Sequence, residues 1–121
     1  MNLFDASALL CHLQGEPGAD VVEARLSDGG VVTAVNWSEI AQKVRSAGGD
    51  WTLARALLLS YDLRVEPVVM ADGEAAAHLW RRGTGLSLAD RICLAVGERL
   101  GAVIWTADAA WGESDAIRQV R

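Results

Sequence analysis

Short apolar runs that alternate with longer helical patterns constrain the fold of this chain more than any other feature. The runs "NLF", "VVTAV", "LRVEPVV" and "AVIWT" cover residues 2–4, 31–35, 63–69 and 102–106 and are typical of short buried strands. Helical patterns cover residues 6–13, 19–26, 37–47, 51–61 and 72–80, and a further helix is expected in "GLSLADRICLA" at 85–95. Strands separated by helices form βαβ units, so we expect a mainly parallel sheet with helices on both faces.

The size and composition of the chain indicate one compact domain. Its 121 residues, of which 51% are hydrophobic, are enough to bury a substantial core, and no linker or repeat divides them. We therefore expect a single α/β domain over residues 1–121, with "IRQV" at 117–120 as a short edge strand. No apolar run is long enough to cross a bilayer, and no signal-like segment opens the chain. A cytoplasmic protein without a membrane partner is the expectation, with Cys11 and Cys93 as buried free thiols.

The net charge argues mildly against nucleic acid as a partner. The chain carries −5 at neutral pH, whereas phosphate contacts are made by Lys and Arg. The objection weakens if some acidic residues are gathered around a cation. With four of the sixteen acids neutralised by the cation, twelve acidic residues would be balanced by eleven basic ones, and the exterior would be nearly neutral.

Acidic residues follow the predicted strands at the same edge of the sheet. Asp5 follows the first strand, Glu39 comes shortly after the second, and Asp108 comes after the fourth. Asp90 joins them from the start of a helix, whereas Asp72 follows the third strand several residues late. Ligands bind beyond the carboxyl ends of strands in such folds, so this edge is the expected site.

Each of these acids also has a simple structural explanation. Ser87 and Asp90 have the spacing of a capping box, and Asn36 with Glu39 has a similar spacing, with Asn36 as the cap. Asp5 and Asp108 can cap the helices that follow them. If the four carboxylates converge, however, they repel one another unless protons or a cation compensate. Oxygen ligands of this kind suit Mg²⁺ or Mn²⁺ rather than zinc.

The four acidic segments together resemble the motifs of PIN domains, in their usual order. They are "LFDASALL", "VNWSEI", "GLSLADRICLA" and "IWTADAAW", and the resemblance runs from Asn2 to about Trp111. The subgroup is similar to the virulence-associated protein C (VapC) toxins of bacterial type II toxin–antitoxin pairs. The resemblance implies a three-layer α/β/α sandwich, Mg²⁺-dependent ribonuclease activity on RNA, and a cognate antitoxin that blocks the site.

The resemblance also assigns roles to individual residues. Asp5, Glu39, Asp90 and Asp108 take the family's acidic positions, with Asp5 and Asp90 as the expected principal metal ligands. Ser7 and Thr106 match its hydroxyl positions and would orient the carboxylates or a bound water.

Two further residues lie near the acids in the sequence, and each has two alternative roles. Asn36 is either a helix cap or a hydrogen-bonding group of the site. Arg91 could reach a phosphate, although a surface role is commoner for such a residue.

The tryptophans and one apolar helix suggest packing surfaces. The five tryptophans are expected mainly in the core. The helix in "WTLARALLLSY", residues 51–61, is more apolar than a solvent-facing helix requires. We expect a homodimer through this helix and its neighbour, with an antitoxin segment in an adjacent groove.

Three other functions are alternatives to a toxin ribonuclease. A phosphoacceptor receiver domain has a similar size and an acidic cluster, but it needs a lysine after its last strand, and the only lysine here is Lys43, inside a helix. A PIN-like module that binds RNA or protein without cleaving is a second alternative, and a housekeeping PIN nuclease is a third.

Overall fold

The computed structural model describes all residues from 1 to 121 and contains five strands and six α-helices. Along the chain they are β1 (Asn2–Phe4), α1 (Ala6–Gln14), α2 (Ala19–Leu26), β2 (Gly30–Thr33), α3 (Ala34–Ser46), α4 (Trp51–Leu59), β3 (Leu63–Glu66), α5 (Met70–His78), α6 (Leu88–Leu100), β4 (Val103–Thr106), a short 3₁₀ helix η1 (Ala109–Trp111) and β5 (Ile117–Gln119). The expected alternation of strands and helices in one α/β domain is confirmed, including the edge strand near the C-terminus.

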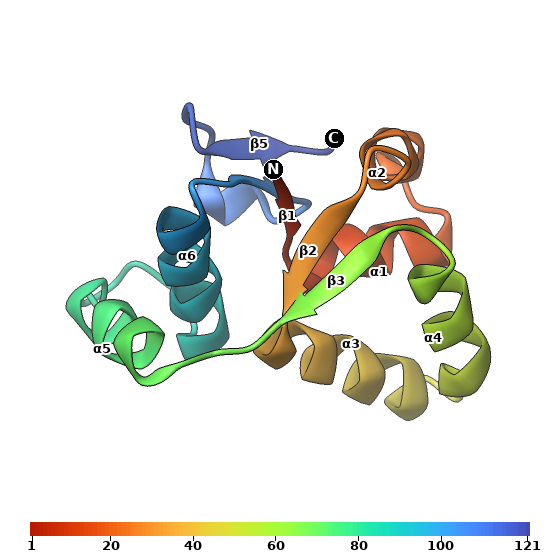
Figure 1. Ribbon diagram of the computed structural model, residues 1–121, viewed down its shortest axis with the longest axis horizontal. Helices are drawn as coiled ribbons and strands as arrows, with labels where there is room; N and C mark the ends of the chain where they lie inside the picture. The colour runs from red at the N-terminus through yellow and green to blue at the C-terminus, as the bar shows by residue number, and fades with distance from the viewer.

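All five strands are parallel and lie in the order β3-β2-β1-β4-β5. The sheet separates α5 and α6 on one face from α1 to α4 on the other (Figure 1). The predicted three-layer α/β/α sandwich is therefore confirmed. Because the strands are parallel, their carboxyl ends meet at one edge of the sheet, which is where the acidic residues were expected.

Alternating side chains of the central strands build the two halves of the core. Leu3 and Val31 point into the layer that contains α5 and α6, while Phe4 and Val32 point into the layer formed by α1 to α4. These four side chains are at most 3% exposed, so β1 and β2 are buried on both faces. Such burial explains why their sequences are continuously apolar rather than alternating.

Two predicted strands end earlier in the structure than the sequence pattern indicated. The second stops at Thr33 rather than at residue 35, because the Thr33 hydroxyl accepts a hydrogen bond from the Asn36 amide (3.0 Å) and caps α3. Helix α3 therefore begins at Ala34, three residues before its predicted start. The third strand stops at Glu66, before Pro67, which has no amide hydrogen for the ladder.

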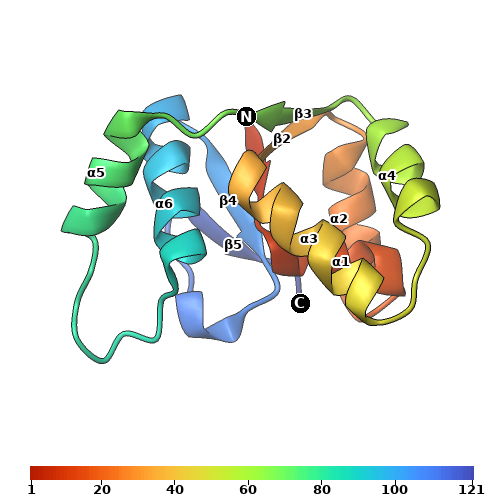
Figure 2. The same cartoon turned by 90° about the horizontal axis from the view of Figure 1, so that it is seen from below.

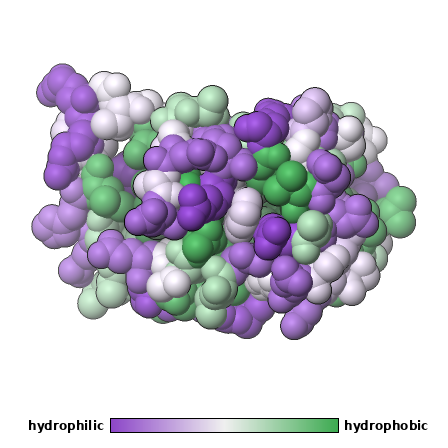
Figure 3. Space-filling view, turned by 90° about the horizontal axis from the view of Figure 1, so that it is seen from above, coloured by the Kyte–Doolittle hydropathy of each residue, from purple (hydrophilic) through white to green (hydrophobic).

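The five tryptophans are less buried than predicted. Four are half-buried, and the side chain of Trp80 is 53% exposed at the end of α5. Cys11 and Cys93 are buried free thiols, as expected. None of the helices is long and apolar enough to cross a membrane. On the face seen from above, apolar and hydrophilic residues are interspersed (Figure 3).

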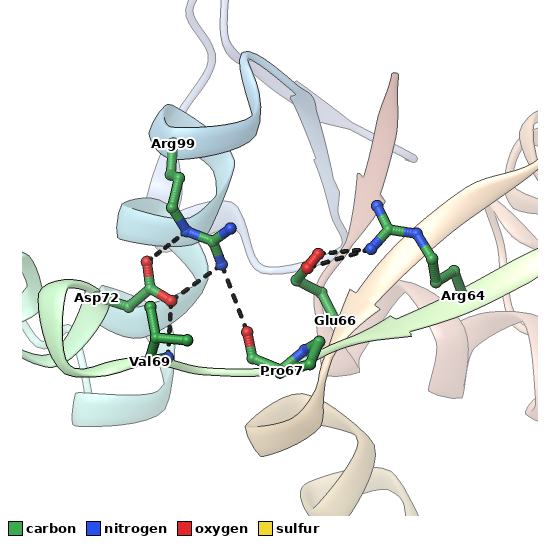
Figure 4. Close-up of polar contacts among 6 residues, drawn as sticks. All are labelled: Arg64, Glu66, Pro67, Val69, Asp72 and Arg99. Carbon is green, nitrogen blue, oxygen red and sulfur yellow. Dashed lines mark hydrogen bonds and ion pairs between the residues drawn. The ribbon is translucent and has the colours of Figure 1, made fainter.

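An ion pair ties α5 to the end of α6. The Asp72 carboxylate, whose side chain is 1% exposed, accepts hydrogen bonds from Arg99 Nε (2.8 Å) and Nη2 (3.0 Å) and from the Val69 amide (3.0 Å). Arg99 also reaches the Pro67 carbonyl, which lies beside the separate pair formed by Arg64 and Glu66 (Figure 4). The Asp72 side chain, which follows the third strand late, is therefore a helix cap and an anchor for α5.

We expect Asp72→Asn to lower the free energy of unfolding at neutral pH by about 1–2 kcal/mol, since a charged hydrogen-bond partner is lost. Hydrogen bonding to Arg99 lowers the pKa of Asp72 below its ordinary value. The ionised carboxylate therefore stabilises the fold above that ordinary value, and this contribution disappears as the pH falls through the lowered pKa.

Urea unfolding of both proteins at neutral pH and near pH 3 checks this prediction. The difference in free energy of unfolding between wild type and Asp72→Asn should be large at neutral pH and small at low pH. Asp28→Asn is the matched control, because its pair with Arg25 is long (3.9 Å) and exposed and should contribute nothing measurable. Equal effects of the two substitutions would contradict the account.

Candidate functional site

Asp5 lies at the carboxyl end of β1 and is held from three directions. Its Oδ1 accepts hydrogen bonds from the Ala8 amide (2.8 Å) and the Ser7 hydroxyl (2.7 Å), and its Oδ2 accepts one from the Thr106 hydroxyl (2.5 Å). The first bond makes Asp5 the N-cap of α1, as predicted. Asp5 is only 4% exposed, so its position and orientation are fixed by the fold.

The hydroxyls of Ser7 and Thr106 are themselves oriented by the backbone that follows β4. The Ala107 amide donates to Ser7 Oγ (2.9 Å), and the Asp108 amide donates to Thr106 Oγ1 (3.0 Å). Each hydroxyl thus accepts from an amide and directs its own proton to Asp5. Both hydroxyls therefore fix the direction of the Asp5 carboxylate.

Glu39 is held by a relay of side chains on the first turns of α3. The Thr33 hydroxyl donates to Asn36 Oδ1 (3.1 Å), and Asn36 Nδ2 donates to Glu39 Oε1 (2.7 Å). Asn36 is 1% exposed and lies inside the helix, so of the two roles expected for it the helix cap is excluded. The cap is Thr33, and the Asn36 amide instead orients the half-buried Glu39 carboxylate.

Asp90 lies in the first turn of α6 and forms the predicted capping box with Ser87. The Asp90 amide donates to Ser87 Oγ (3.1 Å), and the Ser87 amide donates to Asp90 Oδ2 (3.0 Å). These bonds use one carboxylate oxygen and leave Oδ1 without a protein partner.

Three of the four predicted acids act electrostatically on one buried residue of α6, Cys93. Burial raises the pKa of Asp5, and the charge of Asp90 raises it further. The pKa of the buried Cys93 thiol lies well above its ordinary value, because of burial first and then the charges of Asp5, Asp90 and Glu39. These three carboxylates come from the N-cap of α1, from α3 and from the first turn of α6.

No basic side chain neutralises these carboxylates. The three ion pairs of the structure join Arg25 to Asp28, Arg64 to Glu66 and Arg99 to Asp72, and none includes Asp5, Glu39, Asp90 or Asp108. Uncompensated carboxylates that repel one another are costly in a fold and are typical of sites that receive a cation.

Asp108 and Arg91 are less closely joined to this cluster. The exposed Asp108 side chain caps η1 through the Ala110 amide (2.9 Å), and its link to the site is its own amide on Thr106. Arg91, for which a surface role was the commoner expectation, donates from Nη1 to the Ala76 carbonyl (3.0 Å) and so joins α6 to α5.

Gln119 of β5 is a residue that the sequence did not single out. Its Nε2 donates to the carbonyls of Asp108 and Gly112, both at 2.9 Å, and so holds the loop that carries Asp108. Only the pairing of β5 with β4, which brings residues 106 and 119 together, makes this contact visible.

The donors of the candidate site are all oxygens, which suit a hard divalent cation, but they do not form a complete metal-binding cage. No group of three or more His, Cys, Asp or Glu side chains lies close enough together to hold a metal ion. Mg²⁺ commonly binds through one or two carboxylates and keeps several waters, so a complete cage is not required. Asp5 and Asp90, with all-oxygen donors and no basic partner, have the chemistry for that mode.

A five-stranded parallel sheet with carboxylates gathered at its carboxyl edge defines an α/β protein with a candidate cation site. The chain belongs to the PIN domain family, whose model matches residues 3–116. The resemblance seen in the four acidic segments is thereby confirmed.

Solved structures show the same fold at low sequence identity. A toxin–antitoxin complex from Klebsiella pneumoniae is similar with a TM-score of 0.79 and 16% identity, covering 100% of this chain and 98% of that one. The sarcin–ricin-loop-cleaving toxin VapC20 from Mycobacterium tuberculosis has a TM-score of 0.75 and 21% identity, covering 95% of this chain and 98% of that one. No curated protein matches the sequence.

Proposed function

We propose that this protein is a divalent-metal-dependent ribonuclease and the toxin of a type II toxin–antitoxin pair. The observation that carries the proposal is the set of Asp5, Glu39 and Asp90, each held in place by hydrogen bonds and none of them in an ion pair with a basic side chain. Membership of the PIN family and the likeness to toxins of known structure support the choice of RNA as substrate and of an antitoxin as partner. An RNA substrate also supports a cytoplasmic location.

Mg²⁺, or Mn²⁺ in its place, would supply a nucleophilic water and stabilise negative charge on the phosphate. Asp5 and Asp90 would hold the ion, with Glu39 and Asp108 completing its surroundings directly or through water. Neighbouring side chains of the protein position these carboxylates. Ser7 and Thr106 fix the direction of the Asp5 carboxylate, and Asn36 does the same for Glu39.

Cleavage of RNA by the purified protein tests the proposal. We expect cleavage in Mg²⁺ or Mn²⁺, its loss in EDTA, and its return when excess Mg²⁺ is added. A protein that binds RNA but never cleaves it would favour the non-catalytic module. A short upstream reading frame for a DNA-binding antitoxin would separate a toxin from a housekeeping nuclease.

We also propose that the domain spans residues 1–121 and extends beyond the family match, which ends at residue 116. Strand β5 follows that point and completes the sheet. Val120 is 3% exposed within the core, and its amide donates to the Thr106 carbonyl (2.9 Å). The end of the chain therefore supports the strand that carries a residue of the site.

A homodimer through α4 and its neighbour α3 is a further part of the proposal. Leu53, Leu57 and Leu59 of α4 are 69%, 46% and 37% exposed. A hollow of about 320 Å³ lies between α1, α3 and α4 and is suited to an antitoxin segment. Light scattering over a wide concentration range should give a dimer mass, and a monomer throughout would contradict the proposal.

A further inference from the structure

The loop between α5 and α6 is the part of the surface whose charge best suits a polyanion. Residues 75–89 form the longest stretch of this acidic chain without Asp or Glu, and they contain His78, Arg81 and Arg82. All three side chains are exposed. A local positive charge at this position offsets the negative net charge that would otherwise repel RNA.

The two arginines of the loop differ in what they contact. Arg81 Nη1 donates to the carbonyls of His78 (2.7 Å) and Trp80 (2.8 Å), so its guanidinium closes the end of α5. Arg82 is exposed and forms no hydrogen bond or ion pair within the protein. Arg81 therefore shapes the loop, while Arg82 is left to bind a partner.

An exposed aromatic side chain directly precedes these arginines in the sequence. Trp80 is 53% exposed, unlike the other four tryptophans, which are half-buried. The backbone around it is ordered by the Arg81 contacts, by a bond from Thr84 Oγ1 to the Arg81 carbonyl (3.2 Å), and by a left-handed Gly83 (φ 81°). Exposed aromatic rings combined with unpaired basic side chains are what single-stranded nucleic acids bind, and Trp80 and Arg82 place both on one short loop.

The loop borders two segments that carry acids of the candidate site. It runs directly into Ser87, the cap of α6, and so into the turn that carries Asp90 (Figure 2). Thr84 and Leu86 of the loop also line a hollow of about 170 Å³ with Ala110 and Trp111. Those two residues follow Asp108 in η1, so the loop borders the segments that carry two of the four acids.

We propose that residues 80–87 bind single-stranded RNA beside the cleavage site. Arg82 contacts a backbone phosphate, and the Trp80 indole stacks on an unpaired base. This inference rests on the proposed ribonuclease function and assigns the part of the surface that holds the substrate.

Fluorescence anisotropy with a short, unstructured, dye-labelled RNA tests the phosphate contact. Binding is measured in EDTA, so that no metal-dependent cleavage occurs, and over a range of salt concentrations. We expect Arg82→Ala to weaken binding and to reduce the slope of log affinity against log salt by about 0.7, the contribution of one phosphate contact in a single strand. Arg55→Ala is the matched control, because Arg55 is also exposed and unpaired but lies on α4.

The same assay tests the stacking contact. Trp80→Ala should weaken binding about ten-fold without changing the salt slope, and Trp80→Phe should restore most of the affinity. With a duplex RNA of the same length, whose bases are already stacked, the Trp80→Ala effect should disappear. Because the indole is more than half exposed, thermal melting of the variant should match that of the wild type.

The outcomes separate this inference from the proposed function. Equal affinities and slopes for wild type, Arg82→Ala and Arg55→Ala would overturn the inference, as would a wild-type protein that does not bind the RNA. Cleavage in Mg²⁺ that neither loop substitution affects would support the ribonuclease function and refute the role of this loop in binding the substrate. RNA binding that depends on the loop, without any cleavage, would support the RNA-binding role of the loop and refute the ribonuclease function.

Discussion

Asp5→Asn should reduce metal-dependent RNA cleavage at least a hundred-fold while the protein remains folded. Asn keeps the Oδ1 acceptor that caps α1 through the Ala8 amide, so the local structure has its main support. The amide nitrogen, however, cannot bind a cation, and the negative charge of the site is reduced. The expected loss is of the size seen when a group that stabilises developing charge is removed.

Single-turnover cleavage of a labelled RNA in excess Mg²⁺ measures this effect. Asp90→Asn should give a similar loss, whereas Asp20→Asn, which removes an exposed acid from α2, should cleave at the wild-type rate. Circular dichroism and thermal melting verify that each variant is folded. An unchanged rate for folded Asp5→Asn would refute its assignment as a metal ligand.

Gly30→Ala should be the most damaging small substitution in the sheet, with a loss of about 1–3 kcal/mol in the free energy of unfolding. A Cβ at residue 30 would overlap the ring of Phe4 and lie 3.1 Å from the Asn2 carbonyl oxygen. Phe4 is fully buried and cannot move aside without disturbing β1. Because Asp5 follows Phe4 directly, a shift of the ring would also displace the carboxylate and lower activity.

Urea unfolding of a double-mutant set tests the cause of this loss. Phe4→Leu alone should cost about 1–2 kcal/mol, but the double variant should be more stable than the sum of the two losses predicts. Gly73→Ala is the control, since the same substitution in open space within α5 should stabilise the protein by about 0.5–1 kcal/mol. Additive losses at residues 4 and 30 would show that the ring is not the obstacle.

Local sequence patterns were enough to predict the order of the strands and helices and the position of the acids. Ser87 and Asp90 form the predicted capping box, and Asp5 caps α1, because such bonds depend on residues three apart. The sequence misplaced the start of α3, since both Thr33 and Asn36 are good caps and only the end of β2 decides between them.

Contacts between distant segments could not be predicted in this way. The bond from Arg91 to the Ala76 carbonyl and the pair of Arg99 with Asp72 depend on how α5 packs against α6. Gln119 reaches Asp108 only because β5 adds to the edge of the sheet. The strand ends predicted Asp5 and Glu39 at one edge of the sheet and a helix start predicted Asp90 beside them; the structure adds that none of the three is in an ion pair.

Calorimetric titration of the purified protein with Mn²⁺ tests the central claim most directly, because it reports cation binding without needing the correct RNA. We expect saturable binding to the wild type and to Asp20→Asn, and a strong loss of affinity in Asp5→Asn and in Asp90→Asn. Wild-type protein that binds no Mn²⁺, or binding that both site substitutions leave unchanged, would contradict the assignment of these carboxylates as a metal site.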